Sequence, residues 1–101
     1  MIAPGDVVPR LDTSADLYVA VLSGDAHVRA GTGRLITCPF IPGDLAEDAM
    51  ALVVAVEMPR GVLLPELVQW LPSAALDEPI GNVGVASLHE ATAIIAALLR
   101  P

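Results

Sequence analysis

The stretch "LYVAVLSGDAHVRAGTGRLITCPF" (Leu17–Phe40) places two apolar runs on either side of a segment that is rich in glycine and charge. Residues 16–23 form a short segment rich in β-branched and aromatic side chains, which predicts a β-strand buried on both faces. Residues 34–40 predict the next strand, and Pro39 near its end indicates an edge position or a bulge, because proline cannot donate to a ladder. Residues 24–33 contain three glycines and mixed charges, so we expect a loop there.

The remaining apolar segments outside the C-terminus also have the length and composition of short strands. The strongest is "ALVVAVEM", and a proline inside "VLLPELVQWL" disfavours a helix there. The expected elements are strands at 5–10, at 51–58 and within 62–71 (one or two, interrupted by Pro65), a tight turn at 59–61, and a loop or single helical turn at 41–50.

The last segment has a different pattern, which predicts one α-helix over residues 87–99. Ser87 and Glu90 have the spacing of a capping box, in which the two side chains satisfy free backbone amides at a helix start. Apolar side chains then recur at helical spacing, at Leu88, Ala91, Ile95 and Leu98, and Gly81 and Gly84 indicate the preceding loop. The chain is therefore expected to be one mainly β domain of 101 residues, a small barrel of five or six strands with one C-terminal helix.

Composition limits the classes of partner. Hydrophobic residues make up 54% of the chain, more than one small core can hide, so we expect a protein partner or a homodimer. The net charge of −7 lacks the basic footprint of most nucleic-acid binders, although the five arginines could gather on one face. No apolar run is long enough to span a membrane, and no secretion signal is evident, so we expect a cytoplasmic protein.

Few residues suggest cofactor or metal chemistry. Cys38 is the only cysteine, which excludes an internal disulfide and a cysteine zinc site, and its strand context predicts a buried, inert thiol. Two distant histidines and scattered carboxylates do not have metal-ligand spacing. The Gly-Thr-Gly-Arg segment at 31–34 precedes a strand and does not form a phosphate-binding loop. We therefore expect neither a metal nor a cofactor.

In order and spacing, these segments resemble the CcdB and MazF/PemK superfamily of toxins from type II toxin–antitoxin pairs. "PGDVV" (residues 4–8) is similar to the Arg/Lys-Gly-Asp opening of MazF-type toxins. Residues 17–40 are similar to the CcdB pattern of two apolar strands around a charged loop. "ELVQWLPSAALDEPIGNVGVASLHEATAIIAALL" (residues 66–99) matches both branches. The resemblance implies a five-stranded SH3-like barrel with a C-terminal helix, a homodimer, and a small cognate antitoxin whose flexible tail blocks the toxin's site.

The MazF branch implies metal-independent cleavage of single-stranded RNA. Its toxins use an arginine at the start of the second strand and a Thr or Ser after the third, but the matching positions here are the apolar Leu17 and Ile41. A ribonuclease would need substitutes, because a 2′-hydroxyl must lose a proton and the phosphate transition state needs a fixed cation. His27 is the candidate base, and Arg29 and Arg34 are the candidate phosphate ligands. His27 as an ordinary exposed loop residue is the alternative.

The CcdB branch implies a non-enzymatic poison of DNA gyrase or another large enzyme, which binds through a Trp-Gly-Ile tip on the final helix. This chain ends Leu-Leu-Arg-Pro instead and lacks the aromatic residue. A third hypothesis is a degenerate barrel that binds only its antitoxin. The favoured hypothesis is a type II toxin, with a ribonuclease of MazF type preferred to a gyrase poison.

Further residues are candidates for binding the target or the antitoxin. Trp70 is expected in the core or on a dimer surface, and His89 is expected to be exposed on the helix. The acidic run at 44–50 is expected to dock an arginine-rich antitoxin segment or simply to be solvated. The full set of candidate contact residues is Asp25, Thr37, Arg60, Trp70 and Arg100.

Overall fold

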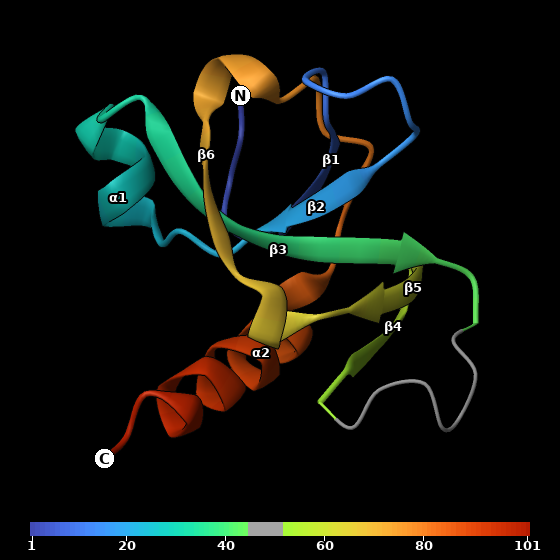
Figure 1. The fold of residues 1–101 in the computed structure, drawn as a ribbon, viewed down its shortest axis with the longest axis vertical. Helices are drawn as coiled ribbons and strands as arrows, with labels where there is room; N and C mark the ends of the chain where they lie inside the picture. Colours follow the sequence, from blue (N-terminus) through green and yellow to red (C-terminus); the bar gives the residue numbers. More distant parts are fainter. Residues whose placement is uncertain (45–51) are drawn as a thin grey trace.

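The computed structural model describes residues 1–44 and 52–101. It is mainly β with a C-terminal helix, as the sequence predicts (Figure 1). The elements are β1 (Asp6–Pro9), β2 (Tyr18–Val21), α1 (Asp25–Ala30), β3 (Arg34–Pro42), β4 (Val54–Glu57), β5 (Arg60–Leu63), the 3₁₀ turn η1 (Pro65–Leu67), β6 (Gln69–Pro72), the 3₁₀ turn η2 (Ser73–Ala75), β7 (Gly81–Asn82) and α2 (Gly84–Leu98).

The strands form one curled antiparallel sheet in the order β4-β5-β3-β2-β1-β7, with β6 also paired to β3. The nine-residue β3 is the central strand. One edge pairs with β2, in the register Ala20↔Cys38, and the other pairs first with β6 and then with β5. The segment after β6 returns to β1 through a bridge between Arg10 and Leu76. Within the described residues the sheet is a half-barrel of seven strands, more than the five or six expected.

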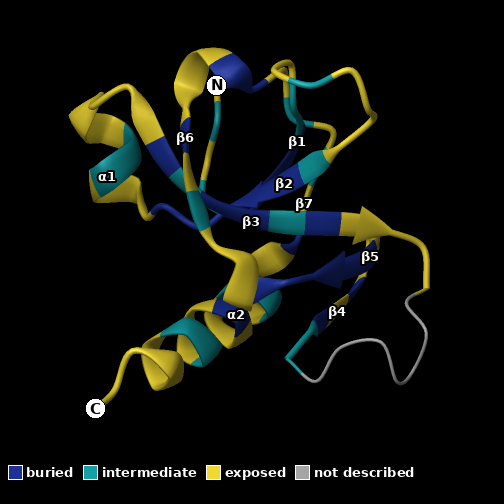
Figure 2. Cartoon of the chain, viewed as in Figure 1, coloured by how far each residue is buried: buried dark blue, intermediate teal, exposed yellow. Residues whose placement is uncertain are grey.

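Alternate side chains of the first three strands supply two cores, one on each face of the sheet. Figure 2 shows β1 and β2 coloured mostly as buried. Val7 and Ala20 belong to the core that α2 covers, and their neighbours Val8 and Val19 belong to the core inside the curl. Both faces of β2 are therefore buried, as the sequence predicts. Within the covered core, the ring of Phe40 lies against Gly61, where a Cβ atom would approach the ring to 2.5 Å.

Of the two positions predicted for Pro39, an edge or a bulge, the edge position is wrong, because β3 is paired along both edges. The Pro39 carbonyl accepts a hydrogen bond from Leu64 N–H at 3.1 Å, so its missing N–H faces the same side. On that side the ladder to β6 stops at Thr37 and the ladder to β5 starts at Phe40. Proline is tolerated here because it stands where no ladder donor is required.

The helix at the C-terminus is confirmed, but its predicted capping box is wrong. The helix begins at Gly84, three residues before Ser87, so Ser87 and Glu90 lie inside it. Instead, the Asn82 side-chain oxygen accepts from Gly84 N–H at 2.7 Å, and its amide donates to the buried Asp6 carboxylate at 3.0 Å. The contact between Asp6 in β1 and Asn82 in β7 therefore sets the start of α2.

The loop predicted at 24–33 is wrong in its centre, where the six-residue helix α1 forms. Gly24 precedes the helix, and Gly31 ends it in the left-handed conformation with φ of 62°. Glycine at the end of a helix is a common stop signal, because it adopts positive φ without steric cost. Six residues are too few for a helical repeat to stand out in the sequence.

The other predicted boundaries are close to the observed ones. The hairpin of β4 and β5 is confirmed, with its turn at Met58–Pro59, one residue earlier than expected. The segment 62–71 contains parts of two strands interrupted at Pro65, as predicted. The expectations for 45–50, including most of the acidic run, lie outside the described residues, as does Ala51 of the predicted fourth strand. Among the described residues, no helix has the length and apolarity to cross a membrane.

We predict that Gly61→Ala lowers the free energy of unfolding by about 1–3 kcal/mol, the usual cost of overpacking. The added methyl would meet the Ile41 carbonyl and the Phe40 ring, both at 2.5 Å. Gly24→Ala is the control, because nothing lies within 4 Å of its added methyl, and we expect a change within about 0.5 kcal/mol. Urea denaturation measures both, and equal changes would contradict the packing described for β5.

Candidate functional site

His27 lies at the centre of a hydrogen-bonded cluster that joins α1 to the sheet. Its Nδ1 lies 2.7 Å from the hydroxyl of Ser23, which is only 1% exposed, and its Nε2 lies 3.3 Å from the hydroxyl of Thr32. Ser23 Oγ also accepts from Ile36 N–H in β3 at 2.8 Å. The Thr32 hydroxyl donates to the Arg34 carbonyl at 3.2 Å. His27 is thus half-buried and held at both nitrogens, unlike the exposed loop residue of the alternative prediction.

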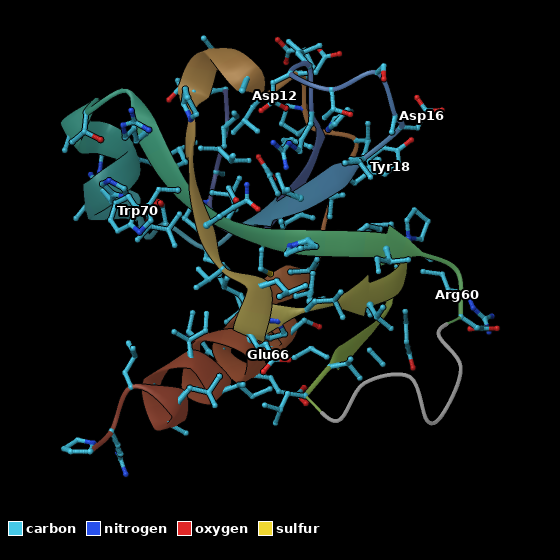
Figure 3. The ribbon with its side chains drawn as sticks, in the orientation of Figure 1. Asp12, Asp16, Tyr18, Arg60, Glu66 and Trp70 are labelled. Carbon is cyan, nitrogen blue, oxygen red and sulfur yellow. The ribbon has the colours of Figure 1, made fainter. Side chains whose placement is uncertain are left out.

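Trp70 completes this end of the molecule. Its ring meets that of His27 edge to face, with the centroids 5.5 Å apart and an interplanar angle of 68°. The side chain lies beside α1 in Figure 3 and is 58% exposed, so the core position considered for Trp70 is wrong. An exposed indole beside a small helix offers a flat apolar surface to a ligand or to another protein chain.

Arg29 and Arg34 lie at the same end, on α1 and at the start of β3, and both are exposed. Within residues 1–44 and 52–101, the ion pairs join Arg10 to Asp12 and Arg60 to Asp44, so neither Arg29 nor Arg34 has a carboxylate partner there. The structure thus brings the three predicted catalytic residues to one end of the fold. Their catalytic role remains a prediction.

The predicted contact residues are dispersed. Asp25 is exposed in the first turn of α1, Arg60 is paired with Asp44 at 2.7 Å, and Arg100 is exposed beyond α2. Thr37 cannot touch a partner, because it is 0% exposed and its hydroxyl donates to the Gln69 carbonyl at 3.0 Å. From the sequence, Thr37 is a polar strand residue available for binding. Its side chain faces inward, however, so its hydroxyl supports the fold instead of a partner.

Cys38 is buried, as predicted. Burial raises the pKa of its thiol to about 12, opposed by a weaker hydrogen bond to the backbone of Leu64. Because the thiolate is the reactive form, this cysteine is not a nucleophile near neutral pH. Among the described residues, no three His, Cys, Asp or Glu side chains lie close enough together to hold a metal ion.

A groove of about 290 Å³ lies at the opposite end of β3, at the mouth of the curled sheet. Leu17 and Ile41, the two positions at which the resemblance places catalytic residues, are both part of its wall. They continue the inward-facing rows that begin with Val19 and Leu35. The wall consists of Arg10, Asp16, Leu17, Tyr18, Val19, Pro39, Phe40, Ile41, Pro42 and Gln69.

The charge of the groove comes mainly from Arg10 and its neighbours, which the sequence analysis did not select. Arg10 donates to both carboxylate oxygens of Asp12, at 2.8 and 2.7 Å. This hydrogen-bonded pair raises the pKa of Arg10 and lowers that of Asp12. Asp16 adds a second carboxylate, and Figure 3 shows Asp12, Asp16 and Tyr18 gathered away from Trp70. The Arg-x-Asp spacing at residues 10–12 was the signal that could have identified this pair.

The comparisons with known proteins identify a toxin family. A sequence profile described as "Type II toxin-antitoxin system toxin Rv0299" matches residues 5–98. Toxin Rv0299 of Mycobacterium tuberculosis (strain ATCC 25618 / H37Rv) is 64% identical over 99 residues, which cover 98% of this chain and 99% of that protein. The match includes both the α1 end and the groove.

Solved structures share the fold at lower sequence identity. A mycobacterial endoribonuclease in complex with its cognate antitoxin covers 100% of both chains, with a TM-score of 0.77 and 17% identity. A MazE–MazF complex from Deinococcus radiodurans matches with a TM-score of 0.78 and 20% identity, and covers 97% of this chain and 95% of that one. The MazF-like fold predicted from the sequence is therefore confirmed.

Proposed function

Because the chain belongs to the Rv0299 family of type II toxins, we propose that it arrests growth by cleaving single-stranded RNA without a metal ion. The observation that carries this proposal is that Arg29 and Arg34 are both exposed at the α1 end with no carboxylate partner among the described residues, in a chain of net charge −7. The fold shared with a mycobacterial endoribonuclease supports it. Gyrase poisoning is less favoured, because the neighbours reported above are of MazF type.

Cleavage requires that an RNA 2′-hydroxyl loses its proton and attacks the adjacent phosphate, while the 5′-oxygen leaves with a proton. The phosphate gains negative charge in the transition state, which Arg29 and Arg34 would stabilise. The α1 end suits this role better than the groove, where the charge of Arg10 is already balanced by Asp12 and Asp16 adds a negative charge. The assignment of His27 as general base remains a prediction.

The groove suits the antitoxin. Its wall is largely apolar at Leu17, Pro39 and Ile41, and Leu17 and Ile41 are 46% and 39% exposed. Burial of an apolar side chain of the antitoxin tail here would remove these surfaces from water. Asp16 at the rim would favour a neighbouring cationic residue in the tail. The groove lies at the other end of β3 from the proposed catalytic residues. An antitoxin bound there would therefore block RNA cleavage through a tail that extends to α1, or without covering those residues.

We also propose a homodimer in which Trp70 contributes to the interface. Trp70 is 58% exposed, and the preceding Leu67 and Val68 are 48% and 39% exposed. Each of these three residues, which are close together in the chain, leaves apolar area exposed to water. A large aromatic residue is the kind of anchor that dimer interfaces favour.

We predict that the purified chain cuts a long unstructured RNA into discrete fragments in EDTA, as seen on a denaturing gel. Arg34→Ala and Arg29→Ala should each slow cleavage by about 100-fold, the usual effect of removing one transition-state donor. Arg100→Ala is the matched control, because it removes an exposed arginine far along the chain, after α2.

Intact RNA would contradict the ribonuclease and direct attention to a protein target, with gyrase capture as the next assay. Cleavage that survives in both α1-end variants but is lost in Arg10→Ala would instead place catalysis in the groove. Cleavage unaffected by all these changes would refute both locations.

We predict that Ile41→Asp weakens binding of the cognate antitoxin at least tenfold, or about 1.4 kcal/mol, because it places a charge on the apolar wall of the groove. RNA cleavage by the free toxin should persist in this variant. Calorimetric titration with the antitoxin measures the affinity, and Val85→Asp on the exposed side of α2 is the control. Equal affinities of Ile41→Asp and the unmodified chain would exclude the groove as the antitoxin site.

We predict that light scattering gives twice the 10.4 kDa mass of one chain at micromolar concentration. Trp70→Asp should shift this mass toward the monomer, because a charge in an apolar interface must be desolvated. Val85→Asp again serves as the control, and circular dichroism confirms that both variants fold. A dimer that persists in Trp70→Asp would place the interface elsewhere.

A further inference from the structure

The hydroxyl of Ser23 constrains which ring nitrogen of a neutral His27 carries the hydrogen. This hydroxyl is 1% exposed, and its oxygen accepts the Ile36 amide hydrogen at 2.8 Å. Its single hydrogen therefore needs an acceptor, and His27 Nδ1 lies 2.7 Å away. If Ser23 donates to Nδ1, the ring must carry its hydrogen on Nε2, because a neutral imidazole has one donor and one acceptor.

The opposite side of the ring is compatible with that arrangement. Nε2–H faces the Thr32 hydroxyl oxygen at 3.3 Å, and the hydrogen of Thr32 is donated to the Arg34 carbonyl at 3.2 Å. One continuous chain of donors therefore runs from the amide of Ile36 through Ser23, His27 and Thr32 to the backbone of Arg34. Every group in this chain has a partner.

The other tautomer does not satisfy the same groups. With hydrogen on Nδ1, Ser23 Oγ would accept from both His27 and Ile36, and the hydrogen of Ser23 would have no acceptor among its described contacts. An unsatisfied donor in a buried position is costly. The tautomer with Nε2–H also has no lone pair free on either nitrogen for a substrate proton.

Among the described residues, few other contacts hold α1 against the sheet. The helix contains no buried residue, and its N-cap Gly24 has no side chain with which to cap it. Val28 packs partly against the inner core, and Arg29 Nε donates back to the Asp25 carbonyl within the helix at 3.4 Å. Among the described residues, His27 provides the side-chain hydrogen bonds that connect α1 to other parts of the fold.

We infer that His27 is a positioning residue, locked by Ser23 as the neutral Nε2–H tautomer, that holds α1 and the Arg29 guanidinium in place and releases them when it is protonated. A second ring proton would make Nδ1 a donor to Ser23 Oγ, and the Ser23 hydrogen would then lose its acceptor. The charged groups nearest to this site in the chain are Asp25 and Arg29 on α1 and Arg34 on β3, and Trp70 faces the ring from β6.

The structural part of this inference is independent of the proposed ribonuclease activity, and only its effect on cleavage rests on that function. Nitrogen-15 NMR of the imidazole rings tests the structural part directly. We expect Nε2–H for His27 at about pH 8, with loss of the α1 backbone signals from their native positions at about pH 5. His89, exposed on α2, is the internal reference for an unconstrained histidine. A His27 ring with Nδ1–H, or α1 signals unchanged in acid, would overturn the inference.

Two substitutions separate positioning from catalysis. His27→Asn places a neutral amide oxygen near the position of Nδ1, where it can accept from Ser23, whereas His27→Ala removes the acceptor. We expect His27→Asn to keep the native α1 signals at both pH values and His27→Ala to lose them at both. The fluorescence of Trp70, the only tryptophan, provides a second measure of the same cluster.

Cleavage then distinguishes the two roles. A positioning role predicts that His27→Asn cleaves RNA at least about tenfold faster than His27→Ala and loses the decline in rate at acidic pH. A general base predicts that both variants lose about 100-fold or more, because neither side chain can take the proton. That second result would refute positioning as the main role. If the unmodified chain cleaves no RNA, the proposed function fails, and the NMR result still determines whether Ser23 locks His27.

Discussion

The hydrogen-bond ladder along β3 is the constraint on which the rest of the molecule depends. This one strand pairs with β2 on one edge and with both β6 and β5 on the other. Its alternate side chains contribute to both cores, with Leu35 inside the curl and Cys38 on the face covered by α2. Because its two ends lie far apart, at the α1 cluster and at the groove, β3 also separates the two candidate functional surfaces (Figure 1).

Charge gives those two surfaces different chemistry. At the α1 end, Arg29 and Arg34 are exposed without a carboxylate partner among the described residues. In the groove, the single arginine is bound by Asp12 and accompanied by Asp16. A polyanion and an apolar peptide would therefore favour opposite ends of the same strand. The net charge of −7 is an average over the whole chain. It hides this local difference and therefore does not exclude RNA binding at the α1 end.

Most of the fold could be predicted from the sequence because its strands bury both faces and its final helix is long. Residues 16–23 carry that signal directly, and the apolar spacing from Leu88 to Ile95 indicates the helix. The helix start could not be predicted, because it depends on Asn82 meeting Asp6, two residues far apart in the chain. The helix α1 was missed because six residues with glycine at each end also fit a loop.

The candidate site was only partly predictable for a similar reason. His27, Arg29 and Arg34 stand out as basic residues in an acidic chain, and their proximity follows from one short connection. The role of Ser23 depends on its burial and on the amide of Ile36, which is 13 residues away in the sequence. Thr37 looked available for binding, although the alternation along β3 places it inward. The sequence shows which residue types lie close together along the chain. It does not show which of their side chains already have hydrogen-bond partners within the fold.

The short turn η1 between β5 and β6 has a consequence for how the two halves of β3 are held. It leaves the sheet opposite Cys38 and Pro39, between the ladder to β6 and the ladder to β5, where Leu64 N–H still donates to the Pro39 carbonyl. The register of Phe40 with Leu63 and that of Leu35 with Leu71 are therefore set on separate sides of η1. Each half of β3 thus has its own pairing partner on this edge, so the α1 end and the groove are held in place by different strands.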